Sequence, residues 1–190
     1  MNTPFKTSKT HPLAIVAVAT PGGGAIGLAM APGKYHSPSI TGPWDRDLDA
    51  DFDAVEAFGA GQVITLMEAS ELDGVKIPVR RLRAACVRRA LHWRHWPIVD
   101  FQAPDPAFEE LWAREAGDVC AHLAGGGRVI VHCRGGRGRS GLVAARLLIE
   151  LGVRNEEAFA AVRAVEPLAM ETAVQEDHVR GFKPVLGLKR

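Results

Sequence analysis

Apolar residues along the chain follow two different periods, and the changes between them predict alternating strands and helices. Continuous apolar runs at 61–67 and 128–132 are typical of strands buried on both faces. A less regular run at 91–99 predicts a further strand, and a β-branched run followed by glycines near residue 22 predicts a strand, a turn and a second strand. Apolar positions at helical spacing predict helices at 47–58, 79–90, 105–123, 139–151, 155–165 and 170–182.

This alternation predicts an α/β fold with a central, mostly parallel twisted sheet of about four to five strands flanked by helices. We expect a single folded domain over residues 12–184, preceded by a disordered segment at 1–11 and followed by a tail at 185–190. In sheets of this kind ligands bind at the carboxyl ends of the strands. The residues that follow the run at 128–132 are therefore the first place to look for chemistry.

The composition is that of a globular protein with a substantial core, since 47% of the 190 residues are hydrophobic and the formal net charge is +1. A charge so close to zero argues against nucleic-acid binding by the whole surface. No apolar run approaches the ~20 residues of a membrane span, and the short run before residue 20 is better explained as a strand than as an export signal. Three cysteines do not make a disulfide framework, so we expect a reducing, cytoplasmic setting.

The segment after the second buried run is HCRGGRGRSG, which combines glycines, arginines and one cysteine. Gly135, Gly136 and Gly138 allow the backbone to turn and to direct successive N–H groups inward. The helix predicted from Arg139 adds its unpaired N–H groups and the positive end of its dipole. Together they predict a cradle for a tetrahedral anion of phosphate size.

Cys133 comes directly before this loop and would lie beneath a bound anion. The amides, dipole and arginine that attract phosphate also stabilise a thiolate, so we expect the pKa of Cys133 to be lowered and its sulfur to be a nucleophile. Arg139 can bind two oxygens of the anion through its planar guanidinium. A phosphate-binding loop with a nucleophile below it predicts phosphoryl transfer.

The Cys-x5-Arg pattern, with His132 before the cysteine and Ser140 after the arginine, resembles the signature of the protein tyrosine phosphatase superfamily. The resemblance extends over residues 22–182 and is strongest to the dual-specificity, cyclin-dependent-kinase-inhibitor-3-like group. Three more stretches carry it: GAIGLAMAPGK, HWPIVDFQAPD and ETAVQE. It implies a phosphatase that hydrolyses phosphomonoesters, on phosphorylated proteins or other phosphate esters, through a cysteinyl-phosphate and without metal or organic cofactor.

The reaction needs a general acid, because the leaving oxygen must be protonated as the P–O bond breaks. The resemblance implies that Asp100, at the end of the stretch PIVD, supplies this proton and later deprotonates the attacking water. Asp105 is the alternative acid. Asp100 could also be a simple turn or helix-cap residue.

Further roles are implied by the same resemblance. Ser140 would donate a hydrogen bond to the departing thiolate, and Gln175 would position the attacking water, although a glutamine on an amphipathic helix can also be simply solvated. His132 is expected to be structural and hydrogen-bonded to the loop backbone. The phosphate-binding set comprises the loop residues Arg134, Gly135, Gly136, Arg137, Gly138 and Arg139.

Two extra cations distinguish this loop from the commoner ones. Arg134 and Arg137 resemble, in position, the paired basic residues of the tensin-like phosphoinositide phosphatases, which implies a phosphoinositide or other polyanion as the alternative substrate. An arginine-rich stretch at 80–94 would strengthen this positive field, while the acidic stretch at 44–56 concentrates negative charge elsewhere. A helix with solvated arginines explains the basic stretch equally well.

Several alternatives remain open at this point. A phosphate-binding module without turnover would keep the loop but would not need Cys133, and a sulfurtransferase or arsenate reductase would not need the PIVD stretch. Cys86 and Cys120 are expected to fill the core, with Cys86 also a candidate disulfide partner for oxidised Cys133. The histidines show no metal-ligand spacing, and the sequence does not indicate the oligomeric state.

Overall fold

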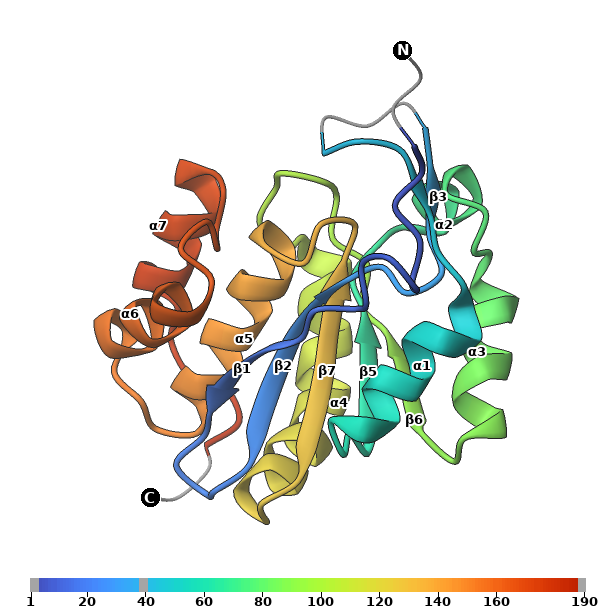
Figure 1. Ribbon diagram of the computed structural model, residues 1–190. Coiled ribbons are helices and arrows are strands. Elements are labelled where there is room, and N and C mark those ends of the chain that lie inside the picture. The colour runs from blue at the N-terminus through green and yellow to red at the C-terminus, as the bar shows by residue number, and fades with distance from the viewer. Residues whose placement is uncertain (1–3, 38–40, 188–190) are drawn as a thin grey trace.

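The computed structural model describes residues 4–37 and 41–187, and a five-stranded sheet forms its centre (Figure 1). The strands lie in the order β1-β2-β7-β5-β6; β1 is antiparallel to β2, whereas the other neighbours are parallel. This confirms the predicted α/β class with a mostly parallel sheet. The bounds are Val16–Ala19 for β1, Ala25–Met30 for β2, Gln62–Thr65 for β5, His92–His95 for β6 and Arg128–Cys133 for β7.

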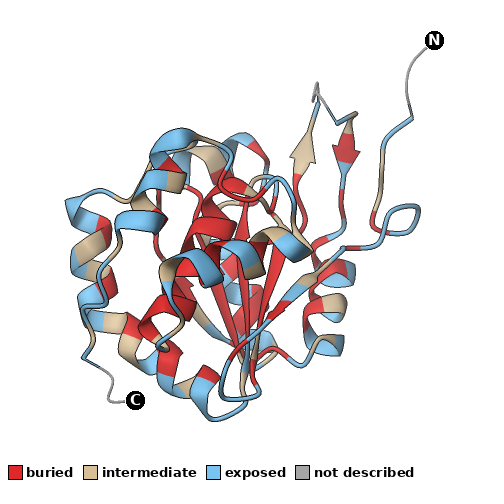
Figure 2. Cartoon of the chain, turned by 90° about the vertical axis from the view of Figure 1, so that its left-hand side faces the viewer, coloured by how far each residue is buried: buried red, intermediate tan, exposed pale blue. Residues whose placement is uncertain are grey.

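Helices cover both faces of the sheet and enclose two hydrophobic cores. Helices α4 to α7 pack on one face and α1 to α3 on the other, and Figure 2 shows the buried residues concentrated between these layers. Strand β7 contributes to both cores, because Val129 and Val131 point to the first and Ile130 to the second. The helix bounds are Leu48–Ala57 (α1), Ala69–Gly74 (α2), Val79–Arg88 (α3), Pro106–Ala124 (α4), Gly138–Glu150 (α5), Asn155–Val165 (α6) and Ala173–Gly181 (α7).

Every helix predicted from apolar spacing is present, with ends shifted by a few residues. Two small features were not predicted: α2, and a hairpin of β3 (Tyr35–His36) and β4 (Trp44–Asp45). Both are too short to display a hydrophobic period. Helix α2 begins instead at a capping box, in which the Glu68 side chain accepts from the backbone of Glu71 and the Glu71 side chain accepts from that of Glu68.

The N-terminal segment is ordered from residue 4, contrary to the disorder expected over 1–11. Lys6 pairs with Trp44 in a parallel bridge, and the Ser8 hydroxyl donates to the buried carboxylate of Asp51 over 2.8 Å. These contacts are made by polar groups and backbone, so the hydrophobic pattern gave no sign of them. Residues 1–3 of that segment and 188–190 of the predicted tail lie outside the described residues.

Close packing fixes the loop between β7 and α5 at the carboxyl edge of the sheet. Gly136 has a φ of 81°, and a Cβ on it would lie 2.6 Å from the carbonyl carbon of Ala29 in β2. Along α5 every residue is buried, and a Cβ on Gly141 would lie 2.6 Å from that of Ala169. Side chains at these two glycines would push the loop and α5 away from their neighbours.

Within the described residues, no helix combines the length and apolarity that crossing a membrane requires.

Candidate active site

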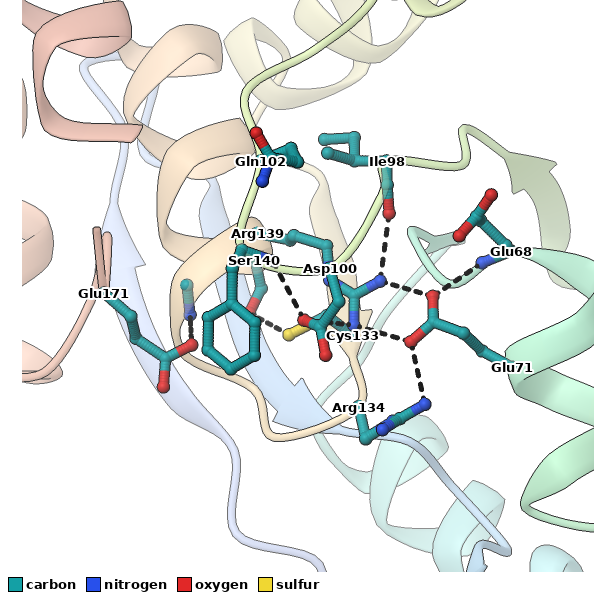
Figure 3. Close-up of polar contacts among 12 residues, drawn as sticks. Glu68, Glu71, Ile98, Asp100, Gln102, Cys133, Arg134, Arg139, Ser140 and Glu171 are labelled. Carbon is teal, nitrogen blue, oxygen red and sulfur yellow. Dashed lines mark hydrogen bonds and ion pairs between the residues drawn. The ribbon is translucent and has the colours of Figure 1, made fainter. Parts of the chain in front are cut away.

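The sulfur of Cys133 lies at the end of β7 among hydrogen-bond donors (Figure 3). The N–H of Gly136 is 3.2 Å from Sγ, and the hydroxyl of Ser140 is 3.3 Å away. The residue is 3% exposed, which leaves the sulfur at the floor of a cavity of about 490 Å³. The structure thus brings together the predicted nucleophile and its predicted hydroxyl donor.

Arg139 is almost completely buried beside this sulfur and is held by three acceptors. Its Nη1 and Nη2 donate to the two carboxylate oxygens of Glu71 over 2.6 and 3.1 Å, and Nη1 also donates to the carbonyl of Ile98. Nη2 lies 2.9 Å from Oδ1 of Asp100. The buried Nε has no hydrogen-bond partner within the described residues. Arg139 lines the cavity, and Nε is the guanidinium nitrogen that the contacts with Glu71, Ile98 and Asp100 leave without an acceptor.

Glu71 organises the site from α2 and was missed by sequence reasoning. Its carboxylate binds Arg139 and also Arg134, which lies 3.1 Å away (Figure 3). Burial by itself would raise the pKa of Glu71, but the hydrogen bond and charge of Arg139 outweigh it and lower the pKa. A local signal existed in the capping box with Glu68, but nothing along the chain connects that box to a loop some sixty residues away.

The two candidate acids occupy different environments. Asp100 faces Arg139 and lines the cavity with Phe101, and its side chain is 34% exposed. Asp105 instead caps α4, where its Oδ1 accepts from the N–H of Phe108 over 2.8 Å. A carboxylate engaged in capping a helix is not free to meet a leaving group, so the geometry favours Asp100 over Asp105.

Residues at the start of α7 hold two loops in place: the loop at 99–105, which carries Asp100, and the loop at 134–138 between β7 and α5, hereafter the anion loop. The hydroxyl of Thr172 donates to the carbonyl of Phe101 over 3.0 Å, and Nε2 of Gln175 donates to that of Gln102 over 3.2 Å. Glu171 accepts from the N–H of Gly138 over 3.1 Å. Gln175 is fully buried and its Oε1 accepts from the N–H of Glu171, so the alternative of a solvated glutamine is wrong.

His132 is fully buried and uncharged at neutral pH. Burial lowers its pKa to about 3, more than the backbone of Cys133 opposes it. Its Nε2 lies 2.8 Å from the hydroxyl of Thr65, which also accepts from the indole N–H of Trp93. The expected structural role fits this burial, and the ring contacts the side-chain hydroxyl of Thr65 in β5 in addition to the backbone of Cys133.

The arginines beyond Arg139 are largely paired with carboxylates. Arg134 contacts Glu71, and Arg137 lies 3.8 Å from Glu166. The basic stretch meets the acidic stretch that was expected elsewhere, since Arg89, directly after α3, contacts Asp49, Asp53 and Glu56 of α1. Arg94 in β6 contacts Glu115 of α4. Separation along the sequence did not mean separation in space, and the expected one-signed field is therefore partly neutralised.

The other two cysteines lie away from the site. Cys86 is buried in the core beneath α1 to α3, on the face of the sheet opposite to Cys133. The prediction that Cys86 forms a disulfide with oxidised Cys133 is therefore wrong. Cys120 lines a different cavity with Glu150, at the far end of α5. Burial raises the pKa of each of these thiols to about 12, as expected for core-filling cysteines. All three cysteines are free.

Comparison with known proteins finds related sequences and folds. The family model described as Swiss Army Knife protein, DSP-PTPase phosphatase domain, matches residues 45–179. Cyclin-dependent kinase inhibitor 3 of the pig, Sus scrofa, is 29% identical over 170 residues, which cover 85% of this chain and 73% of that protein.

Solved structures extend the likeness to the fold. Kinase associated phosphatase, with its catalytic-site cysteine replaced by serine, matches with a TM-score of 0.77 at 23% identity over 94% of this chain and 98% of that chain. Tk-PTP in its active form matches with a TM-score of 0.58 at 26% identity over 80% and 86% of the two chains. PTPMT1 in complex with PI(5)P gives 0.59 at 20% identity, over 82% and 87%.

Proposed function

The chain belongs to the DSP-PTPase family and is a cysteine-dependent protein phosphatase of the dual-specificity type, and we propose that Cys133, Arg139 and Asp100 carry its reaction. The observation on which this rests is their convergence on one cavity. There the sulfur contacts the N–H of Gly136 and the hydroxyl of Ser140, Nε of the guanidinium has no partner within the described residues, and the carboxylate lies 2.9 Å from the guanidinium.

In the first step the sulfur of Cys133 attacks phosphorus as the P–O bond to the substrate breaks. Arg139 and the backbone N–H groups of the loop bind the phosphoryl oxygens, whose charge they stabilise in the transition state. Asp100 donates its proton to the leaving oxygen, and a cysteinyl-phosphate remains.

In the second step a water molecule attacks that phosphorus and the S–P bond breaks. The carboxylate of Asp100 takes a proton from the water, which returns Asp100 to its acid form, and inorganic phosphate leaves. The thiolate that departs is stabilised by the hydroxyl of Ser140 and the N–H of Gly136, both already within hydrogen-bonding distance of Sγ.

We assign Gln175 and Thr172 to positioning. Their bonds to the carbonyls of Gln102 and Phe101 hold the loop that carries Asp100. Because both functional groups of the Gln175 amide already have a backbone partner, this role is better supported than the positioning of water.

The free cysteines support a reducing compartment such as the cytoplasm, and residues 4–11 join the proposed catalytic domain.

Substitution of the nucleophile tests the proposal. Cys133→Ser should abolish hydrolysis of an aryl phosphate, while vanadate binding persists because the amide cradle and Arg139 are intact. Cys120→Ala, which alters the cysteine at the far end of α5, is the matched control and should turn over normally. Activity of Cys133→Ser near that of the unmodified protein would refute the mechanism.

A further inference from the structure

We propose that Lys34 forms the centre of a second anion-binding subsite, which selects phosphopeptides that carry an acidic or phosphorylated residue next to the phosphorylated one that is hydrolysed. The inference rests on the proposed function, because both anions must belong to one substrate held in the cavity above Cys133. Lys34 and Cys133 line that same cavity.

The backbone of Lys34 is fixed by a buried carboxylate. The N–H of the preceding Gly33 donates to Asp51 over 2.8 Å, and the N–H of Arg46 donates to the carbonyl of Lys34. Asp51 is fully buried and binds Arg46 through both carboxylate oxygens. This buried network holds the backbone at Gly33 and Lys34, so the position of the subsite is set before any ligand binds.

The side chain of Lys34 is 4% exposed and reaches the anion loop. Its Nζ donates to the carbonyl of Arg134, the residue directly after the nucleophile, over 3.0 Å. An ammonium group has three donors, and this carbonyl is one acceptor. A buried ammonium placed beside the cradle with spare donors is suited to a second anion of the same substrate.

Lys34 also differs from the arginines around it, because it lacks a carboxylate partner within residues 4–37 and 41–187. Arg46 has Asp51, Arg134 has Glu71, and Arg137 has Glu166. Burial, followed by the charges of these three arginines, lowers the pKa of Lys34 to about 8, although Cys133 opposes the shift. The positive charge is therefore costly in the empty site, and a bound anion would relieve that cost.

Two further residues line the cavity together with Lys34. Lys6 lines it from the N-terminal segment and His36 from β3, and Nζ of Lys6 and of Lys34 lie 5.1 and 5.2 Å from the ring of Trp44, which also lines the cavity. These residues precede the matched family segment, which begins at residue 45. Phe101 lines the same cavity, and this half-exposed residue offers an apolar surface. Lysines and an aromatic ring in one cavity fit a peptide with a negatively charged side chain, and the protein phosphatase activity of the family favours the same class.

A matched peptide panel tests the subsite. Three peptides should share one phosphotyrosine and differ in its neighbour, which is alanine, glutamate or phosphothreonine. We expect kcat/KM to be about 10- to 100-fold higher for the phosphothreonine neighbour than for alanine, the scale of a charge-assisted hydrogen bond. Lys34→Met should remove most of that ratio, whereas Lys9→Met, an exposed lysine outside the cavity, should keep it.

The pH dependence provides a readout that needs no variant. Because the free Lys34 loses its proton near pH 8, the glutamate-to-alanine ratio of kcat/KM should fall between pH 7 and 9 in the unmodified protein. Glutamate does not titrate there, arginine side chains keep their charge, and a change in the catalytic groups affects both peptides equally. Burial, then Lys34 and Arg134, lowers the pKa of His36, so His36 is neutral throughout, and Lys6→Met measures the contribution of Lys6.

The outcomes separate this inference from the proposed function. The subsite would be overturned if the ratio of kcat/KM between the acidic-neighbour and alanine peptides were the same in Lys34→Met as in the unmodified protein, or if it did not change with pH. Hydrolysis of a small aryl phosphate would still support the mechanism in that case. A Lys34-dependent gain seen with a soluble inositol bisphosphate and not with the peptides would overturn the peptide class. Loss of all hydrolysis in the unmodified protein would instead refute the proposed function.

Discussion

Helix α5 carries two completely buried arginines, and their surroundings differ. Arg139 and Arg146 lie two helical turns apart, and each binds both carboxylate oxygens of a glutamate from another helix. Arg146 donates to Glu109 over 2.6 and 2.8 Å, and its guanidinium lies over three aromatic rings, those of Phe108, Trp112 and Phe182, at 5.2, 4.2 and 4.1 Å. Arg139 lies instead among Glu71, Asp100 and Cys133.

The comparison shows that burial and ion pairing do not by themselves identify a functional residue. Both arginines have a buried Nε without a hydrogen-bond partner within the described residues, but only Arg139 among the two lines the cavity. The rings around Arg146 satisfy its cation in a fixed, closed environment. Arg139 instead lines the cavity together with Cys133 and Asp100. We infer that Arg146 stabilises the fold, whereas Arg139 acts on the substrate.

Exchanging each arginine for lysine should separate these roles most strongly. Arg139→Lys keeps the charge but loses the planar fork, so kcat/KM for an aryl phosphate should fall about a thousandfold. Arg146→Lys should keep kcat/KM and lose about 1–3 kcal/mol of unfolding free energy in urea, because its ring contacts and its bidentate pair are lost. Similar losses of activity in both variants would remove the distinction.

The acid that contacts Arg139 should have the next largest effect. Asp100→Asn should lower kcat about a hundredfold or more for a poor leaving group and much less for a good one, since protonation matters less when the leaving oxygen is a weak base. Asp105→Asn should leave kcat unchanged, because asparagine caps a helix as well as aspartate does. The reverse pattern, measured with two aryl phosphates of different leaving-group pKa, would make Asp105 the acid.

The glutamate partners should give the smallest contrast. Glu71→Gln should reduce kcat/KM about tenfold, because the amide holds Arg139 by one acceptor where the carboxylate used two, while Glu109→Gln should not. Because the pKa of Glu71 is lowered in the folded protein, its pairing stabilises the native state at pH values above its ordinary pKa of 4.5. This stabilisation is lost as the pH falls through the pKa of the folded state. Urea unfolding at pH 7 and in acid should therefore show a smaller acid loss for Glu71→Gln, and an unchanged loss would contradict the pairing.

The sequence was sufficient for features whose parts lie close together along the chain. Cys133, the glycines and Arg139 belong to one loop, so the local pattern predicted both their geometry and the strand and helix around them. The long apolar helices were predicted for the same reason, since each shows its own period.

The features that were missed depend on packing between distant segments. Glu71 meets Arg139, and Lys34 meets Arg134, only because the order of the strands brings β2, β5 and β7 side by side. The pairing of the α3 arginines with α1 was missed for the same reason. A contact formed by a buried charge leaves no local period, and so sequence reasoning identified the loop that follows Cys133 but not the groups that hold Arg139 and Arg134.

The central claim is that phosphate is transferred to Cys133, and trapping the intermediate tests it most directly. The variant Asp100→Ala, supplied with an aryl phosphate that has a good leaving group, should accumulate the cysteinyl-phosphate, because the water that hydrolyses it is no longer deprotonated. Rapid quenching followed by peptide mass spectrometry should then find one phosphoryl group on Cys133. Turnover without a phosphoryl group on this residue, or with the group on another side chain, would contradict the account.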